Sequence, residues 1–181
     1  MGSVLPIIIF ILIIFLIIIL STYNTLIRKR NAVNQSRSSI DVYLNLRFDL
    51  IPNLVETVKA YAKHESNLLE SITKLRTSYD ENKNLETATE LNDKMNKLLI
   101  TLENYPELKA SENFLNLQKN LSKIEDQLQA ARRLYNMDVT NFNTSIQTFP
   151  TNLIAKFFNF KAYQLFELEP GKANNIKIDI N

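Results

Sequence analysis

Residues 54–79 read LVETVKAYAKHESNLLESITKLRTSY, and this stretch decides the fold. Its mainly apolar stripe advances in alternating steps of four and three residues, the spacing of a helix face that packs against other helices. The members of the stripe are Leu54, Val58, Tyr61, Glu65, Leu68, Ile72, Leu75 and Tyr79. The pattern predicts one long amphipathic helix, which ends in the polar run at 80–84.

Apolar stripes of the same kind lie on both sides of this helix. One precedes it over residues 26–48, and two follow it over residues 88–105 and 114–142. Pro52 suits the first turn of a new helix, Pro106 ends the 88–105 stripe, and Asn84 and Ser111 are suitable N-caps. We therefore predict turns near positions 51, 82 and 108. Short connections favour antiparallel neighbours, so the expected fold class is all-α, with an N-terminal transmembrane helix followed by an antiparallel up-and-down four-helix bundle.

The transmembrane prediction rests on Val4 to Leu20, which read VLPIIIFILIIFLIIIL without a polar residue. This length lies at the short end of a bilayer span, and Tyr23 can extend the span to the headgroup level. A cleaved signal peptide is disfavoured because no Lys or Arg precedes the run and no Ala-x-Ala pattern follows it. The lipid bilayer is thus the first predicted partner, through Val4–Leu20.

The charges after the span predict its orientation. Arg28, Lys29, Arg30 and Arg37 all follow the apolar run, and positive residues near a span stay on the cytoplasmic side. We expect a single-pass protein of the cell membrane with its N-terminus outside and its bundle in the cytoplasm. The expected domains are an anchor at 1–25, a helical bundle at 26–150, and a C-terminal aromatic segment and tail at 151–181.

Composition argues against several classes of function. The net charge is only +2, which indicates no nucleic-acid partner. The chain has no Cys, one His and two Gly, so it can form no disulfide, no thiolate or multi-histidine metal site within one chain, and no Gly-rich phosphate loop. We predict no catalytic residues, no cofactor and no metal. The pair His64-Glu65 does not change this, because adjacent helical residues point in different directions and supply two ligands at most.

Three stretches are distinctive: IDVYLNLRFDLIPNLVETVKAYAKHE at 40–65, ENYPELKASENF at 103–114 and ARRLYNMDV at 131–139. They resemble the LemA family of membrane-anchored bacterial helical proteins. The resemblance covers most of the chain. The resemblance implies a transmembrane helix followed by long antiparallel helices, and it implies no established enzymatic activity. Some relatives in magnetotactic bacteria are implicated in forming internal membranes.

These observations favour a non-enzymatic, membrane-tethered scaffold or interaction protein. Its partner is an unknown protein or a second copy of the same chain. The alternative is a membrane-remodelling or membrane-organising protein that acts directly on the bilayer.

Four residues are candidates for polar positions in the bundle core: Glu65, Arg37, Arg47 and Asp138. Glu65 occupies a core position of the 54–79 stripe, and a buried carboxylate needs a partner. A turn near Ile51 would bring Glu65 level with Arg37, so we predict that these two residues pair. Arg47 or bound water are the alternatives.

The segment 149–166 is rich in Phe with interspersed Lys, a mixture that suits the headgroup zone of a membrane. Its membrane-contact candidates are Lys156, Phe157, Phe158, Phe160 and Lys161. The three predicted turns would place Met137 at the height of Leu20, so that this segment begins at the membrane surface. The alternative is that its aromatic side chains cover the open end of the bundle.

Overall fold

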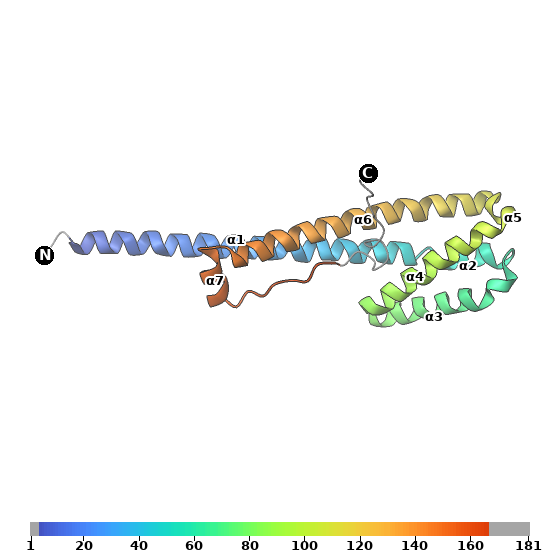
Figure 1. Cartoon of the computed structure of the whole chain (residues 1–181), viewed down its shortest axis with the longest axis horizontal. Coiled ribbons are helices and arrows are strands. Elements are labelled where there is room, and N and C mark those ends of the chain that lie inside the picture. The colour runs from blue at the N-terminus through green and yellow to red at the C-terminus, as the bar shows by residue number, and fades with distance from the viewer. Residues whose placement is uncertain (1–3, 167–181) are drawn as a thin grey trace, which may run out of the picture. The chain divides into compact units, whose positions relative to one another are not determined.

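The computed structural model describes residues 4–166, apart from the side chains of Val4, Lys63 and Leu85, and over these residues it has helices and no strand (Figure 1). The all-α prediction is therefore confirmed. The elements are α1 (Val4–Phe48), α2 (Ile51–Lys59), η1 (Lys63–Glu65), α3 (Ser66–Asn82), α4 (Leu85–Thr101), η2 (Leu102–Asn104), α5 (Pro106–Lys109), α6 (Glu112–Gln147) and α7 (Thr151–Phe157). The chain forms two compact units. Unit 1 combines residues 1–39 with 131–181, and unit 2 is Ile40–Ala130.

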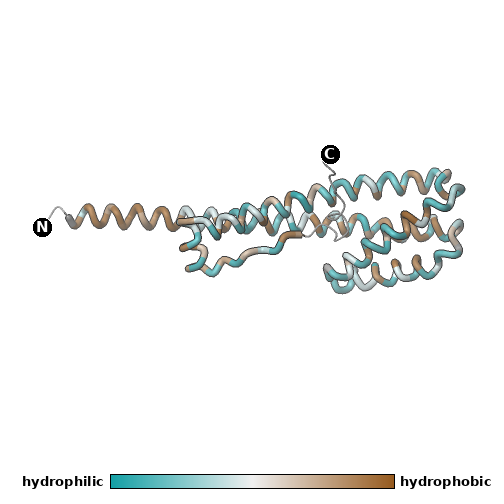
Figure 2. Tube along the Cα trace, in the orientation of Figure 1, coloured by the Kyte–Doolittle hydropathy of each residue, from teal (hydrophilic) through white to brown (hydrophobic). Residues whose placement is uncertain are grey.

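Helix α1 contains the apolar run and continues past it without a break to Phe48. Side chains from Leu5 to Leu20 are largely exposed, and Figure 2 shows them as a brown run. Among the residues described, α1 is the one helix that is long and apolar enough to cross a membrane. The predicted apolar helix is present, and no loop separates it from the helical part that follows.

In unit 1, the second half of α1 packs against the last part of α6. Their buried side chains include Leu26 and Val33 on α1 and Val139 and Phe142 on α6. After α6 the chain turns into α7 and then runs back along α6 over residues 158–166 without regular secondary structure. Unit 1 is therefore two helices joined by a strap, which is the name used below for residues 158–166.

One contact in unit 1 corrects the predicted level of Met137 along the helices. The Lys29 ammonium donates to the hydroxyl of Ser145 at 2.5 Å, so these positions lie level on two antiparallel helices. Met137 then lies near the level of Arg37, and the prediction that it reaches Leu20 is wrong. The segment that follows α7 comes close to the end of the apolar run, because the ring centroids of Tyr23 and Phe158 are 4.7 Å apart.

In unit 2, the first reversal of the chain lies near position 64, and the predicted turn near 51 is wrong. The rings of Phe48 and Tyr79 lie 4.9 Å apart, and Lys83 donates to Asn45 at 3.4 Å. Both pairs are equidistant from a turn at about position 64. The chain therefore continues from α1 into α2 and turns back only around η1.

Pro52 explains why the break near 51 is not a reversal. It occupies the start of α2, where a missing N–H costs nothing and a new helix can begin in the same direction. Ala62 has φ −113° and ψ 63°, which lies outside the helical region. The chain leaves the helix at that residue, although neither Gly nor Pro marks the position.

This turn also changes which side chains of the 54–79 stripe are buried. Leu54, Val58, Ile72 and Tyr79 are buried as predicted. Tyr61 is 42% exposed, whereas Ala62 and Leu69 are buried beside the predicted positions. The helical phase is lost at η1, so a stripe that is continuous in sequence is not continuous in space. In the later stripes, the predicted core positions on α4 and most of those on α6 are buried.

Candidate functional site

The most deeply buried charge in unit 2 is Arg47, which is 2% exposed near the end of α1. Its guanidinium donates to the side-chain oxygens of Asn92, Asn96 and Glu125, with a distance of 2.7 Å to Asn96. Gln129 donates to the other oxygen of Glu125 at 2.7 Å. We call these five residues the Arg47 cluster. It joins α1, α4 and α6 through charge-assisted hydrogen bonds.

The chemistry of the Arg47 cluster is structural. An arginine remains protonated at every physiological pH, so it cannot act as a general base or nucleophile. The three amides do not titrate, and the Glu125 carboxylate is already held by Arg47 and Gln129. The arrangement fixes the register of three helices and presents no reactive group to a substrate.

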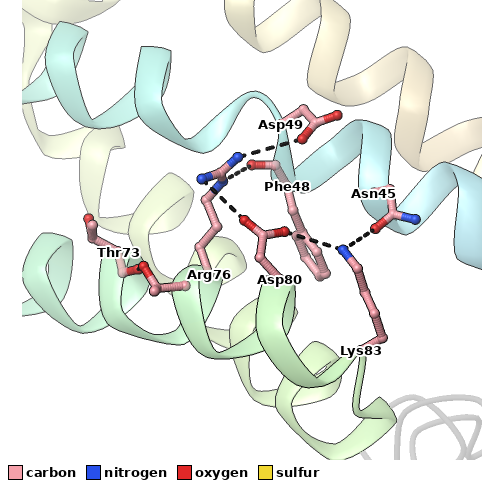
Figure 3. A network of polar contacts seen from close by, with 8 residues as sticks. Asn45, Phe48, Asp49, Thr73, Arg76, Asp80 and Lys83 are labelled. Carbon is pink, nitrogen blue, oxygen red and sulfur yellow. Dashed lines mark hydrogen bonds and ion pairs between the residues drawn. The ribbon is translucent and has the colours of Figure 1, made fainter.

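A second polar network surrounds Arg76 on α3 (Figure 3). Its Nε donates to the backbone carbonyl of Phe48 at 3.1 Å, and its terminal nitrogens lie 3.6 Å from Asp49 and 3.4 Å from Asp80. Lys83 extends the network by pairing with Asp80 at 3.3 Å. The cation at Phe48 satisfies a carbonyl in the last turn of α1, where the helix dipole is negative. This network therefore caps the C-terminal end of α1.

Glu65 is half-buried in η1, and its partner in the structure is the hydroxyl of Tyr105, which donates to it at 3.3 Å. Arg37 is exposed on α1 and belongs to unit 1, whereas Glu65 belongs to unit 2, so the predicted pairing of Glu65 with Arg37 stays a prediction. The displaced first turn removes the level match on which that prediction rested. Burial and the adjacent charge of Glu65 raise the pKa of Tyr105 above its ordinary value. Asp138 is half-buried on α6.

In unit 1, two asparagines of α6 hold the strap by its backbone. Asn143 donates to the carbonyl of Tyr163 at 2.8 Å and accepts from its N–H at 3.0 Å. Asn136 makes the same pair of bonds to Phe166, at 3.0 and 2.7 Å. Asn136 and Asn143 are seven residues apart on a helix, a rise of about 10.5 Å. Their partners Phe166 and Tyr163 are three residues apart in an extended segment, which spans about the same distance.

Side chains of the strap add to these backbone bonds. The ring of Tyr163 lies 5.4 Å from that of Phe142, and its hydroxyl donates to Asn34 of α1 at 3.3 Å. The guanidinium of Arg132 lies 5.0 Å from the ring of Phe166, within cation–π range. The strap therefore links the end of α6 to α1 and is a built part of unit 1.

The membrane-contact candidates divide between this packing and the surface. Phe160 is half-buried, with its ring 6.2 Å from Phe142 and beneath the guanidinium of Arg30 at 5.5 Å. Phe157 is 83% exposed and Phe158 is 44% exposed. The cations Lys156 and Lys161 are also exposed. Phe160 thus packs on the helices, as the alternative predicted, whereas the membrane contact of the exposed Phe157 stays a prediction.

The part of the chain that the structure describes holds no group of three or more His, Asp or Glu side chains placed to bind a metal. His64 is exposed. Unit 2 has an open groove of about 570 Å³ between the α2 region and the start of α6. Its lining is mostly uncharged and includes Asn53, Tyr61, Asn116 and Asn120. Such a surface suits binding more than proton transfer.

Sequence reasoning found Arg47 but missed Asn92, Asn96 and Glu125. Each of these lies between apolar stripe positions, so no signal in the sequence marks it as inward-facing. Asn136 and Asn143 were detectable in principle, because two asparagines seven residues apart share one helix face. Their partner is an irregular segment, however, and the periodicity of a helix does not predict one.

Comparisons with known proteins give a consistent result. The family model described as the LemA family matches residues 36–180. The protein LemA of Metamycoplasma hominis is 30% identical over 164 residues, which covers 86% of this chain and 75% of that protein. Two magnetosome proteins of Paramagnetospirillum magneticum, MamQ 1 and MamQ 2, are each 21% identical over 187 residues, covering 87% of this chain and 69% of each relative.

Proposed function

Because the chain belongs to the LemA family, we propose that it is a single-pass, membrane-anchored scaffold without catalytic activity. The observation that carries the proposal is that the buried polar side chains bind other side chains of the bundle. Arg47 and Asn92 bind within the bundle, and neither lines the groove of unit 2. These hydrogen bonds therefore hold the helices together, and the groove stays open to a partner.

The groove of unit 2 is the surface we assign to a protein partner. Tyr61 is 42% exposed at this groove, and a tyrosine contributes a large contact area together with a hydrogen-bonding hydroxyl. The amides of Asn53 and Asn116 can donate to and accept from a partner's backbone. Only Glu56 brings a charge to the lining, so recognition depends on shape and hydrogen bonds.

Photo-crosslinking tests the scaffold role. A benzophenone amino acid replaces Tyr61 in the full chain, in native membranes, and a matched variant carries it at Ile100, which is 68% exposed and outside the groove lining. We expect a discrete protein adduct from position 61 that is absent at position 100. A differently tagged second copy identifies a homo-oligomer. No adduct at position 61, or equal adducts at both positions, would contradict the proposal.

We further propose that the N-terminus lies outside and that the bundle is cytoplasmic, on the strength of the basic residues from Arg28 to Arg30. The natural chain has no Cys, so single substitutions Ser3→Cys and Ser78→Cys give unambiguous labelling sites. An impermeant thiol reagent on intact cells should label position 3 and not position 78. The reverse pattern would overturn the orientation.

A second candidate is a membrane-organising protein that acts directly on the bilayer. The magnetosome names of two relatives and the exposed Phe157 favour it. Electron microscopy of vesicles containing the full chain tests this role: the chain should change vesicle shape, and vesicles identical to protein-free ones would exclude it.

A further inference from the structure

Charge is divided unequally between the two units. Over residues 4–39 and 131–166, the described part of unit 1, there are eight Lys or Arg and one carboxylate, Asp138, which gives a net charge of +7. Unit 2 has eleven Lys or Arg and fifteen Asp or Glu, a net charge of −4. The modest overall charge therefore hides a strongly basic unit, and this is the unit that contains the apolar run of α1.

Helix α7 of unit 1 buries a small side chain and exposes its larger apolar side chains. Its buried residue is the small Ala155, whereas Leu153 is 62% exposed and Phe157 is 83% exposed. Leu153 and Phe157 are four residues apart and share one face, and Phe149 just before the helix is 80% exposed. A helix stabilised only by its own unit would direct its largest apolar side chains inward. The ring of Phe157 meets that of the adjacent Phe158 at 5.1 Å, and the rest of this face is exposed in the described part of the chain.

The position of α7 identifies what can cover this face. The ring of Tyr23 lies 4.7 Å from Phe158 and 6.0 Å from Phe160, the residues that follow α7. Tyr23 comes three residues after Leu20, where the apolar run of α1 ends. The brown run of α1 in Figure 2 ends close to the place where Figure 1 shows α7 and the end of α6. The exposed face of α7 is thus at the boundary of the region that the bilayer surrounds.

We propose that α7 docks on the surface of an anionic bilayer beside the span. Leu153, Phe157 and Phe149 enter the boundary between headgroups and acyl chains, which interfacial helices penetrate by about 5–10 Å. Lys156 and Lys161 are exposed, and their ammonium groups meet lipid phosphates. The docking fixes the rotation and tilt of unit 1 at the membrane. It requires the anchored chain but not the scaffold role.

The test uses the full chain in vesicles, with single cysteines carrying an environment-sensitive fluorophore. Lipids with a nitroxide high on the acyl chain quench fluorophores at that depth. We expect Leu153→Cys to lose about half of its fluorescence in vesicles that contain phosphatidylglycerol. Met137→Cys is the matched control: it is 54% exposed in unit 1 and lies ten residues before the end of α6, about 15 Å along its axis. It should lose little.

A third label separates failure of the anchor from failure of the docking. Ile11→Cys lies within the apolar run and should be quenched by nitroxides deep in the bilayer in every preparation. Quenching at position 11 without any at position 153 would overturn the docking proposal while leaving the anchor intact. Absence of quenching at position 11 would instead refute the transmembrane span and, with it, the docking.

Lipid composition and one charge variant complete the design. Quenching at position 153 that is equally strong in pure phosphatidylcholine would overturn the assignment to anionic lipid. Lys156→Gln and Lys161→Gln together should weaken the quenching in phosphatidylglycerol vesicles. A label at position 153 that becomes buried only as protein concentration rises, without lipid quenching, would assign the face to a second copy and overturn the proposal.

Discussion

Replacing Arg47 by Met should lower the stability of the bundle more than replacing any exposed arginine. The substitution keeps most of the apolar stem but removes the guanidinium that joins α1 to α4 and α6. Asn92 is only 5% exposed and would keep an oxygen without its donor. Asn96 and Glu125 are less buried, so water can replace part of what they lose.

The magnitude follows from this difference in burial. A buried acceptor that loses its donor costs about 1–3 kcal/mol, and breaking a fully buried ion pair costs roughly 3–5 kcal/mol. The side chain of Glu125 is 33% exposed, which reduces its share. We expect Arg47→Met to cost about 2–4 kcal/mol. For a chain of this size, about 2–4 °C in Tm corresponds to each kcal/mol, so Tm should fall by roughly 5–15 °C.

Far-UV circular dichroism of the full chain in detergent micelles measures this loss. Arg133→Met is the control, because Arg133 is exposed on the same helix as Glu125 and its loss should change the stability by less than about 0.5 kcal/mol. A second variant, Glu125→Leu, alone and combined with Arg47→Met, completes a double-mutant cycle, and the combined loss should be smaller than the two separate losses added. If Arg47→Met melts within about 2 °C of the parent, the Arg47 cluster does not hold the helices together.

Two further predictions concern Tyr79 and the strap. Burial and the nearby charges of Asp41 and Asp80 raise the pKa of Tyr79 in the folded protein. The protonated Tyr79 therefore stabilises the fold below its unfolded pKa near 10, and this stabilisation is lost as pH rises through its folded pKa. Tyr79→Phe should therefore lose less Tm than the parent between about pH 9 and pH 11, and equal losses would contradict this. Asn143→Leu should speed hydrogen exchange of the Tyr163 amide about tenfold by removing its partner, whereas a variant at the exposed Asn141 should not; identical rates would show that the strap is held elsewhere.

Part of the candidate site could be predicted from the sequence. Arg47 was a candidate for a polar core position only as an alternative partner of Glu65, because a buried carboxylate requires a partner. Its actual partners, Asn92 and Glu125, are 45 and 78 residues away along the chain. Asparagine and glutamate on a helix face are common on surfaces as well, so only the packing of three helices shows that these two turn inward.

The strap shows the same division. Its richness in aromatic residues was visible, and two interpretations were open. The structure assigns Phe160 and Tyr163 to packing on α6 and leaves Phe157 exposed. The choice depends on which backbone groups the two asparagines of α6 bind, and a segment without helical or strand periodicity carries no such information in its sequence.

The sequence by itself determined the apolar span, the helical class and most of the local boundaries. These depend on interactions between near neighbours: apolar residues three and four apart, a proline at the start of α5, and Asn84, whose side chain accepts from the N–H of Glu86 at 2.9 Å as an N-cap. Tertiary structure decided where the chain reverses. Pro52 marks a break but not its direction, and the reversal near η1 is fixed by contacts such as Phe48 with Tyr79, between residues that no local pattern relates.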